Sequence, residues 1–135
     1  MAEPEANIDY RTKLIMEILD QWGTTAEQKI ALLSLEGHAR SRHLARFRRG
    51  EALPAVDEVQ QRVEHLLGIA DALWTMNPHN SQIGSIWMNK MHRRFENRTP
   101  LQTMLEDGLE GVLYVRCHVD CAFDWQQDDE NKTTK

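Results

Sequence analysis

One segment of the chain, residues 57–76, repeats apolar side chains at α-helical spacing for about four turns, and this pattern constrains the fold most strongly. Pro54 and Asp57 mark its start, and Asn77 with Pro78 marks its end. The apolar stripe consists of Val59, Val63, Leu66, Leu67, Ala70, Leu73 and Trp74. Glycine and proline together make up only 11 of the 135 residues, and no run of β-branched residues is long enough to indicate a strand. We therefore expect an all-α fold.

Shorter helices are predicted on both sides of this segment. A helix over 8–22 follows from helical spacing of Leu14, Ile15, Ile18, Leu19 and Trp22, and Gly23 ends it. Thr24 and Glu27 form a predicted capping box for a helix over 25–34, with Ile30, Leu33 and Leu35 on its apolar face. Further helices are expected over 40–49, 80–91, 100–107 and 109–123.

The same signals suggest how the chain divides, into one domain or two small domains that share a core. We expect a disordered arm over 1–7, an N-terminal domain of helix–turn–helix type over 8–76 and a second small helical domain over 77–125. Residues 126–135 are acidic and polar, so they are predicted to be a disordered tail.

A dense basic segment lies at 38–49, where five arginines occur without an acid although the whole chain has a net charge of −5. With 26–49 taken as a helix–turn–helix, Leu44 and Phe47 would point into the core and the cations outward to phosphates and guanine edges. The predicted DNA-binding residues are Arg40, Arg42, His43, Arg46 and Arg49. A solvated basic face without a ligand is the alternative. Without Asn or Gln in this helix, adenine recognition is not expected from it.

A second basic cluster precedes residue 99 and consists of Lys90, His92, Arg93, Arg94 and Arg98. It could hold phosphate or the acidic rim of a partner, whereas Lys90 also fits the helix C-terminus, where a cation offsets the dipole. Nearby large apolar residues are expected in the core, although methionine-rich surfaces also form adaptable interfaces. These residues are Trp74, Trp87, Met88, Met91, Phe95, Met104 and Leu105.

Several classes of function find no support in the sequence. Cys117, His118 and Cys121 are only a partial zinc ligand set, and we expect neither a metal nor a cofactor. No nucleophile elbow, glycine-rich phosphate loop or carboxylate pair on an apolar face is present, so we expect a protein that is not an enzyme. With no apolar run near about 18 residues, no secretory signal and no disulfide framework, a cytoplasmic protein is expected.

The segment 99–108 combines several helix-capping signals in a short distance. Thr99 is suited to the N-cap, Pro100 to the first helical position, and Gln102 completes a capping box. Gly108 suits the left-handed residue that ends the helix. Together with Trp87, Phe95, Arg98, Leu101, Met104, Leu105 and the run Leu109-Glu110-Gly111, this segment resembles the toxin-binding domain of the MbcA/ParS/Xre antitoxins.

The resemblance spans residues 27–120 and implies a protein with two roles. It implies an Xre/Cro-like helix–turn–helix module that, as a homodimer, binds the chain's own promoter DNA and acts as an autorepressor. It also implies a small helical domain that follows this module and neutralises a RES-domain, NAD-consuming toxin by occluding its active site. The residues that it implies for toxin binding are Arg116, Asp120, Phe123, Asp124 and Trp125. Members of the family often end soon after the last helix, whereas this chain continues through residues 126–135.

Two other classes of protein fit the same residues. One is a transcriptional regulator whose C-terminal domain only oligomerises. The other is an immunity or interaction protein whose N-terminal module does not bind DNA. Phe123 and Trp125 could form an interface or could pack back on Trp87.

Overall fold

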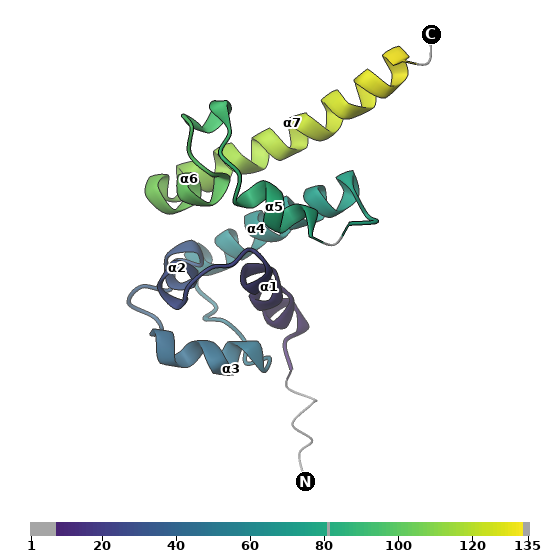
Figure 1. Ribbon diagram of the computed structural model, residues 1–135. Helices are drawn as coiled ribbons and strands as arrows, with labels where there is room; N and C mark the ends of the chain where they lie inside the picture. The colour runs from purple at the N-terminus through teal and green to yellow at the C-terminus, as the bar shows by residue number, and fades with distance from the viewer. Residues whose placement is uncertain (1–7, 81, 134–135) are drawn as a thin grey trace. The chain divides into compact units, whose positions relative to one another are not determined.

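The computed structural model describes residues 8–80 and 82–133, and side chains are described as far as residue 121. Within these residues the chain is all helical, with an isolated antiparallel bridge between His92 and Arg98 and no strand, so the predicted all-α class is confirmed (Figure 1). None of the described helices is long and apolar enough to span a bilayer.

The chain divides into two compact units, 1–64 and 65–135, which are described separately. The division falls inside helix α4 (Asp57–Met76), whereas the sequence suggested a boundary after residue 76. The reason is that the two halves of α4 have different neighbours. Arg62 donates to the carbonyl oxygen of Leu32 at 3.2 Å in unit 1, and His65 accepts from Arg116 at 2.8 Å in unit 2.

Unit 1 contains α1 (Tyr10–Gln21), α2 (Ala26–Leu32), a 3₁₀ turn η2 (Ser41–His43), α3 (Leu44–Arg48) and the first half of α4 (Figure 1). Asp9 caps α1 by accepting from the backbone N–H of Arg11 at 3.1 Å. Helix α1 packs against α3. The buried apolar side chains of the unit come from all of these helices and include Ile15, Leu19, Trp22, Leu32, Leu33, Leu35, Leu44, Phe47, Val59 and Val63.

The start of α2 differs by one residue from the prediction. Thr25 is the N-cap, and its capping box is completed by Gln28 instead of Glu27. Thr24 is buried, and its hydroxyl donates to the carbonyl oxygen of Leu19 at 2.8 Å. The hydroxyl of Thr24 is thus occupied at the end of α1, and the neighbouring Thr25 caps α2.

The predicted helix over 40–49 is also different in the structure. Residues 41–43 form η2 and only Leu44–Arg48 form an α-helix, because Arg40 is extended and its N–H donates to Nδ1 of His43 at 2.9 Å. Leu44 and Phe47 are buried as predicted. The basic segment is thus presented by a short, two-part helical element.

Unit 2 contains the second half of α4, α5 (Ile83–Met88), η3 (Arg93–Phe95), α6 (Pro100–Asp107) and α7 (Leu109–Thr133) (Figure 1). The bounds of α6 match the prediction, whereas α5 is shorter than 80–91 and α7 continues beyond 123 through most of the predicted tail. Helices α6 and α7 pack along each other. Buried side chains that fill this unit include Leu66, Ile69, Leu73, Met88, Phe95, Met104, Val112, Val115 and Val119.

Several predicted core residues of unit 2 lie elsewhere. Met88, Phe95 and Met104 are buried, but Trp74 is 54% exposed and Met91 is 64% exposed. Trp87 and Leu105 are half-buried. The buried side of the second half of α4 is the one with Leu66, Ile69 and Leu73, and Trp74 lies outside it.

Candidate functional site

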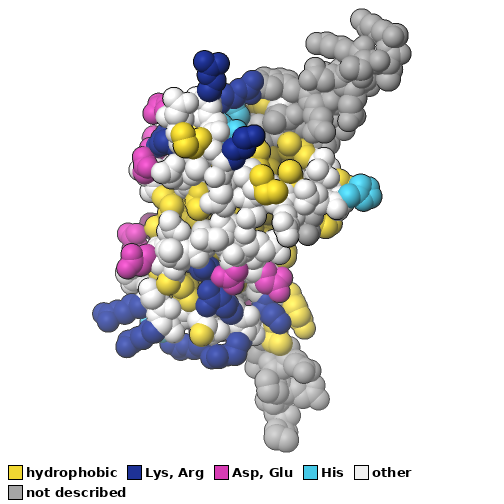
Figure 2. Space-filling model, viewed as in Figure 1, with side chains coloured by type: hydrophobic (Ala, Val, Ile, Leu, Met, Phe, Trp, Pro, Cys, Tyr) yellow, Lys and Arg dark blue, Asp and Glu magenta, His cyan; other side chains and the backbone are white. Residues whose placement is uncertain are grey.

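Unit 1 presents a row of arginines around η2 and α3, which we call the arginine surface. It consists of Arg40, Arg42, Arg46 and Arg49, all of which are exposed. Figure 2 shows dark-blue side chains gathered over this part of unit 1. The surface is held in place because Leu44 and Phe47, from the same segment, are buried in the core. The arrangement offers forked, always-charged donors to an anionic ligand.

Arg48 lies in the same helix but has a structural role. Its Nε and Nη2 donate to the two carboxylate oxygens of Asp20, each at 3.1 Å. The same carboxylate pairs with Lys29 at 2.9 Å, and Lys29 is only 2% exposed and also donates to the carbonyl oxygen of Thr24. The hydrogen bond from Arg48 lowers the pKa of Asp20, as does the bond from Lys29. Asp20 therefore ties α1 to α2 and α3.

His43, which the sequence placed among the DNA contacts, is half-buried and accepts the backbone N–H of Arg40 through Nδ1. Desolvation lowers its pKa, and the charges of Arg46 and Arg42 lower it further. At neutral pH it is therefore uncharged and adds no positive charge to the arginine surface. Glu51 lies 4.0 Å from Arg46, and because both side chains are about half exposed this ion pair contributes little.

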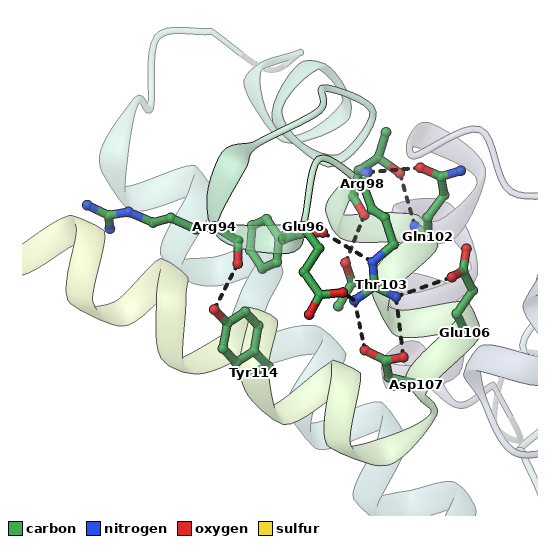
Figure 3. Close-up of polar contacts among 10 residues, drawn as sticks. Arg94, Glu96, Arg98, Gln102, Thr103, Glu106, Asp107 and Tyr114 are labelled. Carbon is green, nitrogen blue, oxygen red and sulfur yellow. Dashed lines mark hydrogen bonds and ion pairs between the residues drawn. The ribbon is translucent and has the colours of Figure 1, made fainter.

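In unit 2, Arg98 joins the segment around η3 to α6 (Figure 3). Its guanidinium donates to Glu106 at 3.2 Å and to Asp107 at 3.0 Å, and its Nε donates to the carbonyl oxygen of Phe95 at 3.1 Å. The hydrogen bond to Asp107 raises the pKa of Arg98 and lowers that of Asp107. Only 21% of the Arg98 side chain is exposed. Within the second basic cluster, Arg98 thus has a structural role.

The helix start that follows has the capping contacts expected from the sequence. The Thr99 hydroxyl accepts from the N–H of Gln102 at 3.0 Å, and the Gln102 side chain accepts from the N–H of Thr99 at 2.9 Å. Pro100 occupies the first turn. Gly108 ends α6 with φ 65° and ψ −139°, a positive-φ conformation that glycine adopts easily but that is not the predicted left-handed helical one.

Sequence reasoning did not identify the role of Gly111, which lies where α7 approaches α6. A Cβ atom at this position would overlap the backbone carbonyl oxygen of Thr103. An isolated glycine inside a helical pattern was the available signal, since it indicates a close approach of two backbones. Within the run Leu109-Glu110-Gly111, the glycine is therefore required for the close packing of α7 on α6.

Because the cap of α6 is formed by a side-chain hydroxyl, we expect Thr99→Ala to lower the stability of unit 2. The expected loss is about 0.5–2 kcal/mol, as for other threonine N-caps. Denaturant unfolding of the full chain measures it, with Thr133→Ala as a control at the far end of α7. An unchanged unfolding midpoint would contradict a capping role for Thr99, and loss of partner binding without loss of stability would make the segment an interface.

The residues implied for toxin binding fall into two groups. Arg116 is half-buried and directed within unit 2, where it donates to Nδ1 of His65 and lies against Gly68 of α4. Asp120 is exposed. The side chains of Phe123, Asp124 and Trp125 lie outside the described residues, although α7 continues through these positions. Arg116 thus makes a contact within unit 2.

No group of three or more His, Cys, Asp or Glu side chains in the described part of the chain is arranged to hold a metal ion. Cys117 and Cys121 are exposed, and neither forms a disulfide.

No protein-family model matches the sequence, and no curated protein or solved structure matches it either.

Proposed function

We propose that the chain is the antitoxin of a type II toxin–antitoxin system, which neutralises a RES-domain toxin and represses its own promoter. No catalytic step is assigned to it. The observation that carries the proposal is that each unit has a feature suited to one role, the arginine surface in unit 1 and the α6–α7 arrangement in unit 2.

The arginine surface supports the DNA-binding role. Arg40, Arg42 and Arg49 have no ion pair with another described residue, and Arg46 has only the long, exposed pair with Glu51. A phosphodiester backbone would supply the missing negative charges, and binding of this kind releases counterions. The surface therefore favours a nucleic-acid partner over an uncharged one.

The toxin-binding role is supported by the resemblance to the MbcA/ParS/Xre antitoxins and by the length of α7. The motif residues Arg98, Thr99, Pro100 and Gly111 all serve the joint between η3, α6 and α7. The last buried residue on the described part of α7 is Val119, and the helix continues to Thr133. We infer that the C-terminal part of α7 is the segment that enters the partner's active site.

The proposal is tested by deleting residues 121–135 and measuring protection of cells that express the cognate toxin. The variant keeps every buried residue of α7 up to Val119, so we expect a folded, DNA-binding protein that no longer protects. Deletion of 126–135 alone is the matched control, because it retains Phe123 and Trp125.

Full protection by the shorter variant would refute occlusion by the end of α7. It would favour a transcriptional regulator whose C-terminal domain only oligomerises, a class that retains DNA binding. Loss of folding, seen by circular dichroism, would instead assign the deleted residues to the core.

A further inference from the structure

Aromatic rings gather in unit 2 where the η3 segment meets α7. Phe95 is only 1% exposed, and the rings of Tyr114 and His118 on α7 lie 5.5 and 5.0 Å from its ring, measured between centroids. Trp87 and His92, which precede η3, lie 5.9 and 5.7 Å from the same ring. We call these five residues the ring cluster. Through it, Phe95 packs the η3 segment against α7.

Arg94, next to Phe95, contacts the same two residues of α7. The hydroxyl of Tyr114 donates to the carbonyl oxygen of Arg94 at 2.8 Å (Figure 3). Nη1 of Arg94 lies 3.4 Å from Nε2 of His118. A guanidinium group can only donate, so Nε2 of His118 accepts and carries no hydrogen. The contact therefore requires the neutral form of His118.

The surroundings of His118 oppose a positive charge on its ring. Desolvation lowers the pKa of His118, and the positive charges of Arg94 and His92 lower it further. Attraction of a charged imidazole to the rings of Phe95 and Tyr114 would act in the opposite direction, but burial and the nearby cations outweigh it, since the pKa is lowered. The other ionisable side chains on η3 and on the neighbouring positions of α7 are Arg93, Cys117, Asp120 and Cys121.

His92, the other histidine of the ring cluster, makes a contact of a different kind. Its Nε2 lies 3.3 Å from the carbonyl oxygen of Trp87, which can only accept, so this nitrogen carries a hydrogen. A proton added at Nδ1 leaves that bond in place. The backbone N–H of His92 also donates to the carbonyl oxygen of Arg98 at 3.1 Å. Within the ring cluster, His118 is thus the histidine whose contact depends on its being neutral.

We propose that the ring cluster is an acid-sensitive clamp, in which neutral His118 holds η3 on α7 and protonated His118 releases it. A proton from the solvent binds the Nε2 lone pair, so the bond from Arg94 is lost and two cations face each other. Separation of η3 from α7 relieves this repulsion. Arg98 stays tied to Glu106 and Asp107, which confines the release to the residues before it.

The direction of the pH effect follows from the difference between the folded and unfolded chains. Because folding lowers the pKa of His118, the unfolded chain binds the proton more readily. The stabilisation by the clamp is complete above the ordinary histidine pKa of 6.5 and is lost as the pH falls from there through the lowered pKa. Below both values, the equilibrium constant for opening is raised by about tenfold for each unit of lowering.

The first test is an NMR titration of the full-length protein from about pH 8 to about pH 5, the range in which histidines change charge. The His118 ring signal, assigned by its absence in His118→Gln, should titrate below the ordinary histidine range. Arg94→Gln should shift its midpoint upwards, because it removes a nearby positive charge. Nuclear Overhauser contacts between Phe95 and Tyr114 should weaken with the same midpoint as His118. Contacts that persist below this midpoint, or a midpoint in the ordinary range, would refute the clamp.

The second test compares unfolding by urea at about pH 7.5 and about pH 5, on either side of the ordinary histidine range. His118→Gln keeps an acceptor for Arg94 but cannot titrate, so it should lose less stability on acidification than the wild type. His79→Gln is the matched control, because it changes an exposed histidine of the same unit, and it should follow the wild type.

An equal loss of stability in all three proteins would overturn the proposal. If His118→Gln does not fold, the titration and the Phe95–Tyr114 contacts of the wild type decide alone. Neither test involves toxin or promoter DNA, so its failure would leave the proposed function to its own experiment.

Discussion

Replacing Arg42 and Arg46 together with alanine is expected to weaken binding to promoter DNA strongly, with little effect on helicity. Each lost phosphate contact should reduce the slope of log affinity against log salt by about one, and each lost two-pronged guanine contact should cost about 1–3 kcal/mol. Both residues are exposed and belong to the arginine surface, so the core is not disturbed. Gel-shift titration at several salt concentrations measures both quantities.

Two controls separate local contact from total charge. Lys90→Ala with Arg93→Ala removes the same charge from unit 2 and should leave binding nearly unchanged. Arg48→Ala, in the same helix, removes the bond to Asp20 and should lower stability more than DNA affinity. If the Arg42/Arg46 variant binds as tightly as the wild type, the arginine surface has no recognition role, and an immunity or interaction protein becomes the better class.

Gly111→Ala is expected to destabilise unit 2, and by more than Gly68→Ala. The added methyl group would overlap the Thr103 carbonyl oxygen, which belongs to the α6 backbone and cannot turn aside, so α6 and α7 would have to separate. Overpacking of this kind typically costs about 1–3 kcal/mol and occasionally more. The measurement is denaturant unfolding of the full chain.

Gly68→Ala provides a matched control in the same unit. There the new Cβ would lie 2.8 Å from the guanidinium carbon of Arg116, which is the end of a flexible side chain and can move. Alanine also gains roughly 0.5–1 kcal/mol over glycine inside a helix, so this variant should be close to neutral. Equal losses for the two variants would show that the close approach at Gly111 is not special.

The comparison of sequence and structure shows which parts of the fold are determined locally. The bounds of α6 follow from Thr99, Pro100 and Gly108, whose capping chemistry depends only on near neighbours. The choice between Thr24 and Thr25 could not be made this way, because both are followed three residues later by a residue that can complete a capping box, and only the structure shows that Thr24 bonds to Leu19. Local signals therefore predicted that α2 exists but missed its first residue, whereas they predicted both ends of α6.

The candidate sites show the same limit. The exposure of Arg40, Arg42, Arg46 and Arg49 could be anticipated because Leu44 and Phe47 mark the opposite side of the segment. That Arg48 binds Asp20, and Arg116 turns to His65, could not, since these partners are distant in the chain. Ion pairs and hydrogen bonds between residues far apart in the chain cannot be predicted from the spacing of apolar residues in the sequence.

The contacts of Arg98 bear on how relatives of this chain would diverge. Its guanidinium is occupied by Glu106 and Asp107, so a change at Arg98 leaves two neighbouring acids without their cation, and a change at Asp107 removes its two-pronged acceptor. We therefore expect Arg98 and Asp107 to change together during evolution, independently of what each relative binds. A shared Arg98-Thr99-Pro100 signature would then indicate common ancestry of the scaffold and not a common partner.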